Sequence, residues 1–230
     1  MIDFHSHILP NVDDGSRSVD ESLRLLDLLR DQNVSSVVAT PHFYANEQSV
    51  ENFLQRRQEA YDALLEQMRP DHPVIRLGAE VHYYPGISRL DDLRALCLDG
   101  TRVLLLEMPM THWTDYTIKE LLDMVNSRGV TLVLAHIERY RQLQDKRLLE
   151  RLLHAGVLMQ VNATFFVERR TRHRALKLLG NQMLHFIGSD CHGIKIRPPH
   201  MGEAMDIIGK KFGDSFLREM NEFATEMISV

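Results

Sequence analysis

The first fifteen residues, MIDFHSHILPNVDDG (1–15), decide the fold that we expect for this chain. Apolar and polar residues alternate over 2–4, which predicts a strand leading directly into His5 and His7. In an extended segment residues i and i+2 point to the same side, so the two imidazoles can converge on one point. Neutral imidazole is a common metal ligand, and the two aspartates at 13–14 can turn back as oxygen ligands. A lone His-x-His pair is equally compatible with polar residues at a strand end, so the rest of the chain has to decide.

The rest of the chain repeats this pattern of a strand that ends in a polar residue and is followed by a helix. The predicted strands cover 2–4, 34–40, 74–79, 102–106, 130–135, 157–161 and 184–188. The predicted helices are a leucine-rich run with acids in its first turn (20–29), then 49–68, 87–97, 115–128, 144–155, 170–180, 200–211 and 213–228. Seven buried-looking strands alternating with helices predict an α/β fold with a parallel sheet.

A closed barrel explains this pattern better than an open, doubly wound sheet. In a barrel all strand carboxyl ends meet at one face, whereas in an open sheet only the residues near a switch point meet. No Gly-rich dinucleotide or phosphate loop follows the first strand. We therefore expect a TIM-like barrel, with 201–230 packed on its outside.

Length and composition bound the class of protein. The 230 residues favour one domain, 1–230, and a hydrophobic fraction of 44% with a charged fraction of 26% is ordinary for a globular protein. A net charge of −5 with scattered cations argues against general nucleic-acid binding. No apolar stretch approaches the ~20 residues of a membrane span, and Cys97 and Cys191 are too few for a disulfide framework. We expect a cytoplasmic protein without membrane insertion, whose oligomeric state the sequence does not indicate.

Histidines and acids just past the predicted strands form the candidate site. They are His5, His7, Asp14, His42, Glu80, Glu107, His136, Asp190 and His192, with Asn162 at the end of another strand. Any one of them has a simpler explanation as a hydrogen-bonded neighbour. Burying all of them at one barrel mouth without a cation would cost on the order of several kcal/mol. More than eight candidates exceed the need of one tetrahedral ion, so we expect two or three ions, bridged by Glu80 or Glu107. The donor set suits Mn, Fe or Zn better than Ca.

These residues carry a resemblance that covers nearly the whole chain. The segments are DFHSHILPNVDDG, TPHF, GAE at 78–80, LLLEMP, LAHIERY and GSDCHG. They resemble the polymerase-and-histidinol-phosphatase (PHP) superfamily and, more narrowly, the manganese-dependent bacterial protein-tyrosine phosphatases encoded with capsule and exopolysaccharide genes. Met108, Met110 and the loop over 110–116 depart from the pattern.

The resemblance implies a distorted (β/α)7 barrel of PHP type with a three-metal cluster holding Mn2+, with Fe, Zn or Mg as other possible ions. It implies hydrolysis of phosphotyrosine on a membrane-associated tyrosine autokinase that controls polysaccharide synthesis. It also implies that Arg139 and Arg197 hold the phosphate.

The expected chemistry is in-line attack on phosphorus by a metal-bridging water whose pKa is lowered toward neutrality. Arg139 and Arg197 would bind the phosphate oxygens, and Asp14 would belong to the catalytic set. His42 or His192 could donate a proton if it is not a metal ligand. A phenol leaving group, with a pKa of about 10, needs little help from an acid. Loop aromatics could flank the phosphotyrosyl ring or pack on the barrel rim: Phe43, Tyr44, Tyr83, Tyr84, Trp113, Phe165 and Phe166.

Three alternatives stay open at this point. Cys191 and Arg197 fit the Cys-x5-Arg pattern of thiol-based phosphatases, but Asp190 beside the thiol would raise its pKa. The metals could instead serve histidinol phosphate, a nucleic-acid 3′ end or a C–N bond. A metal-binding regulatory module without catalysis is the third alternative.

Overall fold

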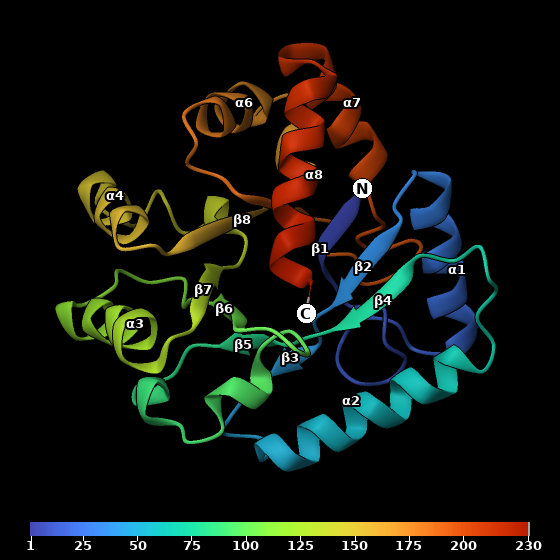
Figure 1. Cartoon of the computed structure of the whole chain (residues 1–230), viewed down its shortest axis with the longest axis horizontal. Coiled ribbons are helices and arrows are strands. Elements are labelled where there is room, and N and C mark those ends of the chain that lie inside the picture. Colours follow the sequence, from blue (N-terminus) through green and yellow to red (C-terminus); the bar gives the residue numbers. More distant parts are fainter. Residues whose placement is uncertain (230) are drawn as a thin grey trace.

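The computed structural model describes residues 1–229 and is an α/β fold with strands inside and helices outside (Figure 1). In this range the strands are β1 (Ile2–Ser6), β2 (Ser36–Ala39), β3 (His42–Phe43), β4 (Val74–Leu77), β5 (Glu80–His82), β6 (Val103–Glu107), β7 (Thr131–Leu134), β8 (Leu158–Asn162) and β9 (Phe186–Gly188). The paired strands are all parallel to their neighbours. The expectation of an α/β fold with parallel strands is confirmed.

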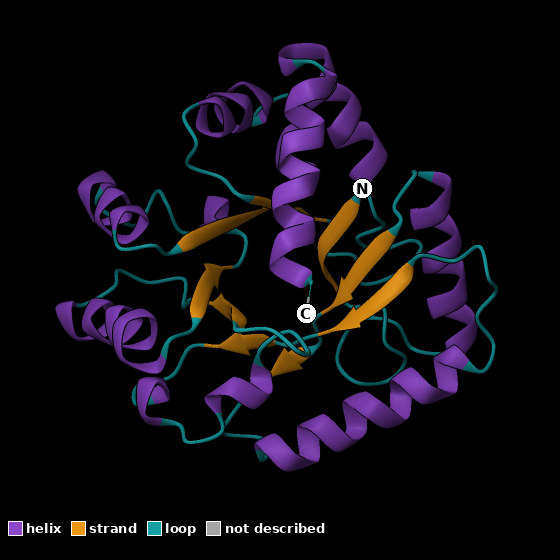
Figure 2. Ribbon diagram, in the orientation of Figure 1, coloured by secondary structure: helices purple, strands orange, loops and turns teal. Residues whose placement is uncertain are grey.

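The helices form the outer layer (Figure 2). They are α1 (Val19–Asp31), α2 (Val50–Leu65), α3 (Asp115–Arg128), α4 (Lys146–His154), α5 (Thr164–Val167), α6 (Arg172–Gly180), α7 (Met201–Phe212) and α8 (Asp214–Ile228). Hydroxyl caps fix several helix starts: Ser18, Ser49 and Thr114 each accept a hydrogen bond from a backbone N–H in the first turn. None of the helices within residues 1–229 combines the length and the apolar character needed to cross a membrane.

Two of the seven predicted strands are interrupted, so the predicted count does not match the strands observed. The prediction over 34–40 corresponds to β2 and β3, and that over 74–79 to β4 and β5. Pro41 has no N–H to donate, so β2 ends at Ala39. The Glu80 N–H donates to the Pro41 carbonyl over 3.0 Å, which carries the pairing past the break.

The predicted helix over 87–97 is wrong. This segment forms two short 3-10 turns, η1 (Ile87–Arg89) and η2 (Leu93–Leu96). The Glu120 carboxylate of α3 accepts the Gly86 N–H over 2.8 Å, and the Leu90 carbonyl accepts from the Arg128 guanidinium over 2.6 Å. Because side chains of α3 take these backbone groups, a continuous helix does not form.

The strands belong to two sheets that curve around a shared interior. One sheet has the order β1-β2-β4, and the other has the order β3-β5-β6-β7-β8-β9. A parallel bridge between Ser6 and Cys191 joins the end of β1 to the segment after β9. Two hydrogen bonds reinforce it, from the Asp190 N–H to the His5 carbonyl (2.8 Å) and from the His7 N–H to the Cys191 carbonyl (3.0 Å).

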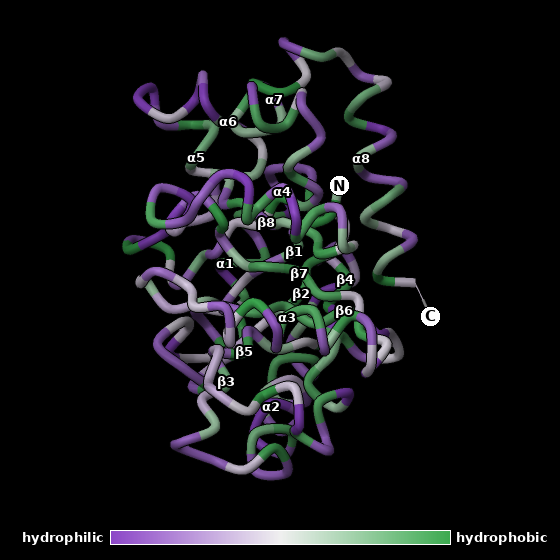
Figure 3. Tube along the Cα trace, turned by 90° about the vertical axis from the view of Figure 1, so that its left-hand side faces the viewer, coloured by the Kyte–Doolittle hydropathy of each residue, from purple (hydrophilic) through white to green (hydrophobic). Residues whose placement is uncertain are grey.

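The interior is apolar toward the beginnings of the strands and polar toward their ends. Phe4, Val38, Leu105, Val133 and Phe186 form an apolar cluster that Ala224 and Ile228 of α8 complete. In Figure 3 the hydrophobic segments concentrate along the strands, and α8 runs along one side of them. Because side chains alternate along a strand, Leu105 and Glu107 point to the same side. The acids and histidines therefore lie in a basin whose base is this apolar cluster.

Candidate metal centre

The structure brings all nine predicted metal ligands together at the carboxyl ends of the strands. They are His5 of β1, His7 and Asp14 after it, His42 of β3, Glu80 of β5, Glu107 of β6, His136 before the 3-10 turn η3 (Ile137–Arg139), and Asp190 and His192 after β9. Three groups have ligand atoms within 4.8 Å of one another: His7, Asp14, His42 and His192; His5, His7 and Asp190; His42, Glu80 and Glu107. His136 adjoins the third group, with its Nε2 2.8 Å from the Glu80 carboxylate.

Glu80 lies at the centre of the basin. Its Oε2 is 3.1 Å from His5 Nε2, 3.2 Å from His7 Nε2 and 3.1 Å from His42 Nδ1. Burial favours the neutral acid, but the histidines around it hold the pKa of Glu80 well below its usual range. Glu80 is therefore a buried carboxylate that faces several nitrogen donors.

The donor set fits divalent metal ions. Donor atoms bound at about 2.1 Å and at tetrahedral or octahedral angles lie roughly 3.0–3.4 Å apart, and His5 Nε2 is 3.1 Å from His7 Nε2. Glu80 Oε2 and His42 Nδ1 are buried and 3.1 Å apart, but among residues 1–229 neither makes a hydrogen bond of acceptable geometry. Buried polar atoms without partners are rare in native proteins. A cation between them satisfies both, and mixed imidazole and carboxylate ligands are typical of Mn, Fe and Zn sites.

The buried carboxylates of this basin favour positive charge on the groups around them. Burial opposes protonation of His136, but the Glu107 and Glu80 carboxylates raise its pKa to about 9. Burial likewise opposes protonation of His7, yet the Asp13 carboxylate is the main reason that its pKa lies well above the ordinary value. Protonated histidines or bound cations can supply that charge.

Sequence reasoning missed the residues that orient the ligands. Asp13 accepts from His7 Nδ1 over 2.7 Å and from the His42 N–H over 2.9 Å. The hydrogen bond between His7 Nδ1 and Asp13 fixes the tautomer of neutral His7, so that Nε2 presents its lone pair to the basin. The sequence suggests Asp13 only as an oxygen ligand beside Asp14, although its partner His7 lies six residues earlier.

Two further orienting residues lie below the basin. The Tyr140 hydroxyl is 2.7 Å from His136 Nδ1, and Gln160 Oε1 accepts the His136 N–H over 2.6 Å and lies 3.3 Å from His5 Nδ1. At the rim, His82 Nδ1 is 3.1 Å from Glu107. The period of two along a strand was a usable signal for Gln160 and His82, because they lie two residues from Asn162 and Glu80.

The two predicted phosphate-binding arginines enter the basin from the rim. Arg139 contacts Asp190 Oδ2 at 2.5 Å, and Arg197 pairs with the same oxygen. Arg197 Nη1 also lies 3.0 Å from His192 Nε2, and Asn162 donates to Asp190 over 2.7 Å. Their side chains are 35% and 40% exposed, so both guanidinium groups are open to a ligand from solvent.

Three residues of this site have a strained backbone. His136, Asp190 and Arg197 have positive φ angles of 30°, 51° and 56°. Such conformations cost non-glycine residues on the order of 1–3 kcal/mol and persist where the surroundings enforce them. At all three positions the strained backbone aims a side chain into the basin.

Most of the predicted loop aromatics pack into the core rather than face the site. Five of them are buried: Phe43, Tyr83, Trp113, Phe165 and Phe166. Tyr44 is different, because its ring centroid lies 5.4 Å from those of His42 and His82. Of the seven, Tyr44 is therefore the residue whose ring contacts histidines of the candidate site.

Cys191 does not have the environment of a nucleophile. Its side chain is fully buried, and burial raises the pKa of its thiol to about 12. The Arg197 guanidinium binds Asp190 and His192. The Cys-x5-Arg spacing is therefore a coincidence in this fold.

Comparisons with known proteins agree with this geometry. Residues 1–228 match the family described as capsular polysaccharide synthesis, CpsB/CapC. The tyrosine-protein phosphatase CpsB of Streptococcus pneumoniae is 36% identical over 96% of this chain and 94% of its own. The tyrosine-protein phosphatase YwqE of Bacillus subtilis (strain 168) is 29% identical over 97% of this chain and 90% of its own.

Solved structures show the same relation. A chain from the crystal structures of YwqE and CpsB, described as unique metal-dependent tyrosine phosphatases, superposes with a TM-score of 0.84 and 25% identity. The match covers 99% of this chain and 94% of that one. An amidohydrolase with a TM-score of 0.57 and 8% identity shares the fold alone.

Proposed function

The chain belongs to the CpsB/CapC family of capsular polysaccharide synthesis, and on this premise we propose that it is a metal-dependent protein-tyrosine phosphatase. The observation that carries the proposal is the convergence of eight histidines and acids in three ligand groups, with His136 adjoining them, beside two arginines. Structural or storage metal sites do not require a pair of solvent-open guanidinium groups. Hydrolysis of a phosphate ester uses both features.

The metal ligands in this proposal are His5, His7, Asp14, His42, Glu80, Glu107, His136, Asp190 and His192. Divalent ions held there would supply an activated water and positive charge toward the phosphate. Glu80 is placed to be shared between ions, because both of its oxygens face imidazole nitrogens. We assign two or three ions to the site and manganese as the native metal, with Fe, Zn or Mg as the other candidates.

Arg139 and Arg197 provide the substrate-binding half of the chemistry. Both now pair with one oxygen of Asp190, and a phosphate dianion offers each of them a stronger, bidentate partner. They orient the phosphorus over the basin and neutralise charge as the ester bond breaks. The leaving phenol has a pKa of about 10, so the ester bond can break without a general acid, and His42 and His192 are kept as metal ligands in this proposal.

The substrate that we propose is phosphotyrosine on a protein, specifically on a membrane-associated tyrosine autokinase of polysaccharide assembly. The relatives are named tyrosine-protein phosphatases, and the family is described by capsular polysaccharide synthesis. We also propose that residues 1–230 form one domain with a distorted (β/α)7 barrel. In this barrel β2 with β3, and β4 with β5, each count as one interrupted strand, which gives seven strands in all. The bridge between Ser6 and Cys191 supports closure of that ring.

The test is a hydrolysis assay on chelator-treated protein with and without added Mn2+. We expect phosphotyrosine peptide to be hydrolysed only after Mn2+ is restored, and much faster than histidinol phosphate or a single-stranded oligonucleotide. His7→Gln should lose activity by a factor of about 100 or more. Cys191→Ser is the matched control and should keep most of it. Chelator-resistant activity that the Cys191→Ser change abolishes would overturn the proposal.

A further inference from the structure

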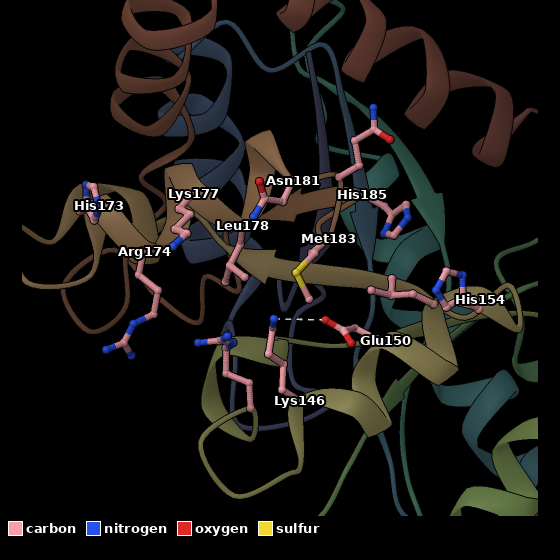
Figure 4. Close-up of a pocket in the computed structure, with 13 residues that line it drawn as sticks. Lys146, Glu150, His154, His173, Arg174, Lys177, Leu178, Asn181, Met183 and His185 are labelled. Atoms are coloured by element: carbon pink, nitrogen blue, oxygen red, sulfur yellow. Dashed lines mark ion pairs between the residues drawn. The ribbon is translucent and has the colours of Figure 1, made fainter.

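A basic groove runs between α4 and α6, outside the metal centre. Its volume is about 810 Å³, and its charged lining includes Arg141, Lys146, Glu150, Arg174 and Lys177. Figure 4 shows Lys146 and Glu150 on α4 and Arg174 and Lys177 on α6, on opposite sides of the opening. Cationic side chains of both α4 and α6 therefore line the same groove.

Most of this positive charge has no internal counterion. Lys146 pairs with Glu150 at 3.3 Å. For Arg141, Arg174 and Lys177, no acidic partner lies within 4.0 Å in the part of the chain that the structure describes. Burial and the neighbouring Arg174 guanidinium lower the pKa of Arg141, as expected for two cations that line the same groove.

The groove belongs to a strongly basic segment of an acidic chain. The segment 139–177 holds ten of the 27 Lys and Arg residues but only three of the 32 Asp and Glu residues. A solvated surface would spread these charges over a convex face. Here four of the ten, Arg141, Lys146, Arg174 and Lys177, line a concave surface together with apolar side chains that can contact the aliphatic parts of a peptide, namely Leu153, Leu178 and Met183.

The groove is also linked to the catalytic machinery through the chain. Arg141 lines it and lies two residues after Arg139, whose guanidinium contacts Asp190 in the basin. The first turn of α6 follows α5 and β8, and β8 ends at Asn162, which also contacts Asp190. The groove therefore shares the segment after β7 with the arginine that is proposed to bind the phosphate.

We propose that this groove binds an acidic stretch of the phosphotyrosine-bearing substrate protein. The proposal rests on the proposed function and adds a substrate class, namely tyrosine sites flanked by Asp or Glu. Uncompensated cations in a concave surface attract such a segment, increase its rate of encounter and select it over a neutral one. The groove thus recognises sequence around the phosphotyrosine, while the metal centre cleaves the ester.

The experiment compares two phosphotyrosine peptides of equal length, one with Glu residues in the flank and one with Gln in their place. Arg174→Glu with Lys177→Glu reverses the groove charge, and Lys210→Glu with Lys211→Glu is the matched control on α7, where both lysines are exposed. We expect wild type and control to prefer the Glu peptide by about tenfold in kcat/KM, mainly through KM, and added salt to weaken the preference. The groove variant should lose this preference and hydrolyse free phosphotyrosine at the wild-type rate.

The outcomes separate the two proposals. If the Mn2+-loaded wild type hydrolyses neither peptide nor phosphotyrosine, the proposed function fails. If it hydrolyses both peptides equally, or if the groove variant keeps the preference, the groove proposal fails and the proposed function stands. Binding of phosphatidylserine vesicles that the groove variant loses, without any peptide preference, would also overturn the proposal, because it would assign the groove to a lipid surface.

Discussion

Asp3 is a buried carboxylate directly next to the ligands of the proposed metal centre. Its Oδ1 accepts hydrogen bonds from the N–H groups of Ser189 (2.7 Å) and His5 (3.3 Å), and within residues 1–229 its Oδ2 has no partner. Burial raises the pKa of Asp3 from 3.8 to about 6, against the hydrogen bonds that lower it. The folded chain therefore holds a proton on Asp3 more tightly than the unfolded chain does.

This shift makes stability depend on pH. Because the folded-state pKa lies above the unfolded one, the contribution of Asp3 is full below pH 3.8 and is lost as the pH rises through about 6. The difference corresponds to roughly 3 kcal/mol at neutral pH. In chelator-treated protein, we expect Asp3→Asn to gain up to about this much in free energy of unfolding, relative to wild type, between pH 4 and pH 7. Urea unfolding at several pH values measures it.

Asp13 is the matched control, because its shift has the opposite sign. Burial opposes its ionisation, but the charge of His7 and hydrogen bonds from His7 and Gly15 hold the pKa of Asp13 below its usual range. Asp13→Asn should therefore lose stability relative to wild type as the pH rises from below to above the unfolded pKa. Parallel pH dependences for the two variants would contradict both assignments.

At the residue scale, the sequence predicts the ligands at the strand ends, but it does not predict which ligand each supporting residue contacts. His5, Glu80 and Glu107 follow apolar strands, and parallel topology alone brings such positions together. Tyr140 and Gln160 act through another side chain, and nothing in their local sequence shows which imidazole they will meet. That information exists only after the chain has folded.

At the element scale, β9 depends on the absence of a side chain at Gly188. A Cβ there would lie 2.5 Å from His5 Cβ and 2.9 Å from Gln160 Nε2. His5 cannot withdraw, because its backbone N would also lie 2.9 Å from the added Cβ and it belongs to β1. Gln160 Nε2 could move only by giving up its hydrogen bond to Asn162. β9 is thus held between two strands that carry ligands and their supports.

We expect Gly188→Ala to push β9 away from β1, to lower the free energy of unfolding by about 1–3 kcal/mol, and to weaken metal binding. Gly202→Ala in α7 is the control, since its Cβ would lie 3.2 Å from Gln32 and a helix favours alanine, so its effect should stay within about 1 kcal/mol. Thermal unfolding and Mn2+ titration measure the two effects. A Gly188→Ala protein with wild-type stability and metal affinity would show that β9 can shift freely.

The elements that the sequence predicted well carry their own boundary signals. The predicted helix over 115–128 has the same bounds as α3, where Thr114 caps the start and Gly129 ends the helix at a φ of 62°. The segment over 87–97 has helical spacing, but Glu120 and Arg128 of a different element bind its backbone. Local spacing cannot predict that competition. The break at Pro41, in contrast, is visible in the sequence, because a proline cannot donate a strand hydrogen bond. It accounts for the division of the predicted strand into β2 and β3.

At the scale of the whole molecule, the candidate metal centre depends on both sheets at once. His5 and His7 come from the end of the three-stranded sheet, whereas His42, Glu80 and Glu107 come from the six-stranded sheet. The group formed by His7, Asp14, His42 and His192 joins residues from near both ends of the chain. No local segment can hold an ion in this way, so the unfolded chain should bind metal only weakly. Metal binding and folding are therefore linked.

This linkage predicts a metal-dependent melting temperature. A ligand that binds only the folded state stabilises it by about 2.7 kcal/mol when its concentration is 100 times Kd. For a domain of this size each kcal/mol shifts Tm by about 2–4 °C, so restoring Mn2+ to chelator-treated protein should raise Tm by roughly 5–10 °C. Differential scanning calorimetry measures the shift. Cys191→Ser should respond as wild type does, because its buried thiol is not among the proposed ligands, whereas His7→Gln should lose most of the response. If Mn2+ leaves the Tm of both wild type and Cys191→Ser unchanged, the proposed metal centre would be contradicted. The negative charge of the acids would then be neutralised by protonated histidines rather than by metal ions.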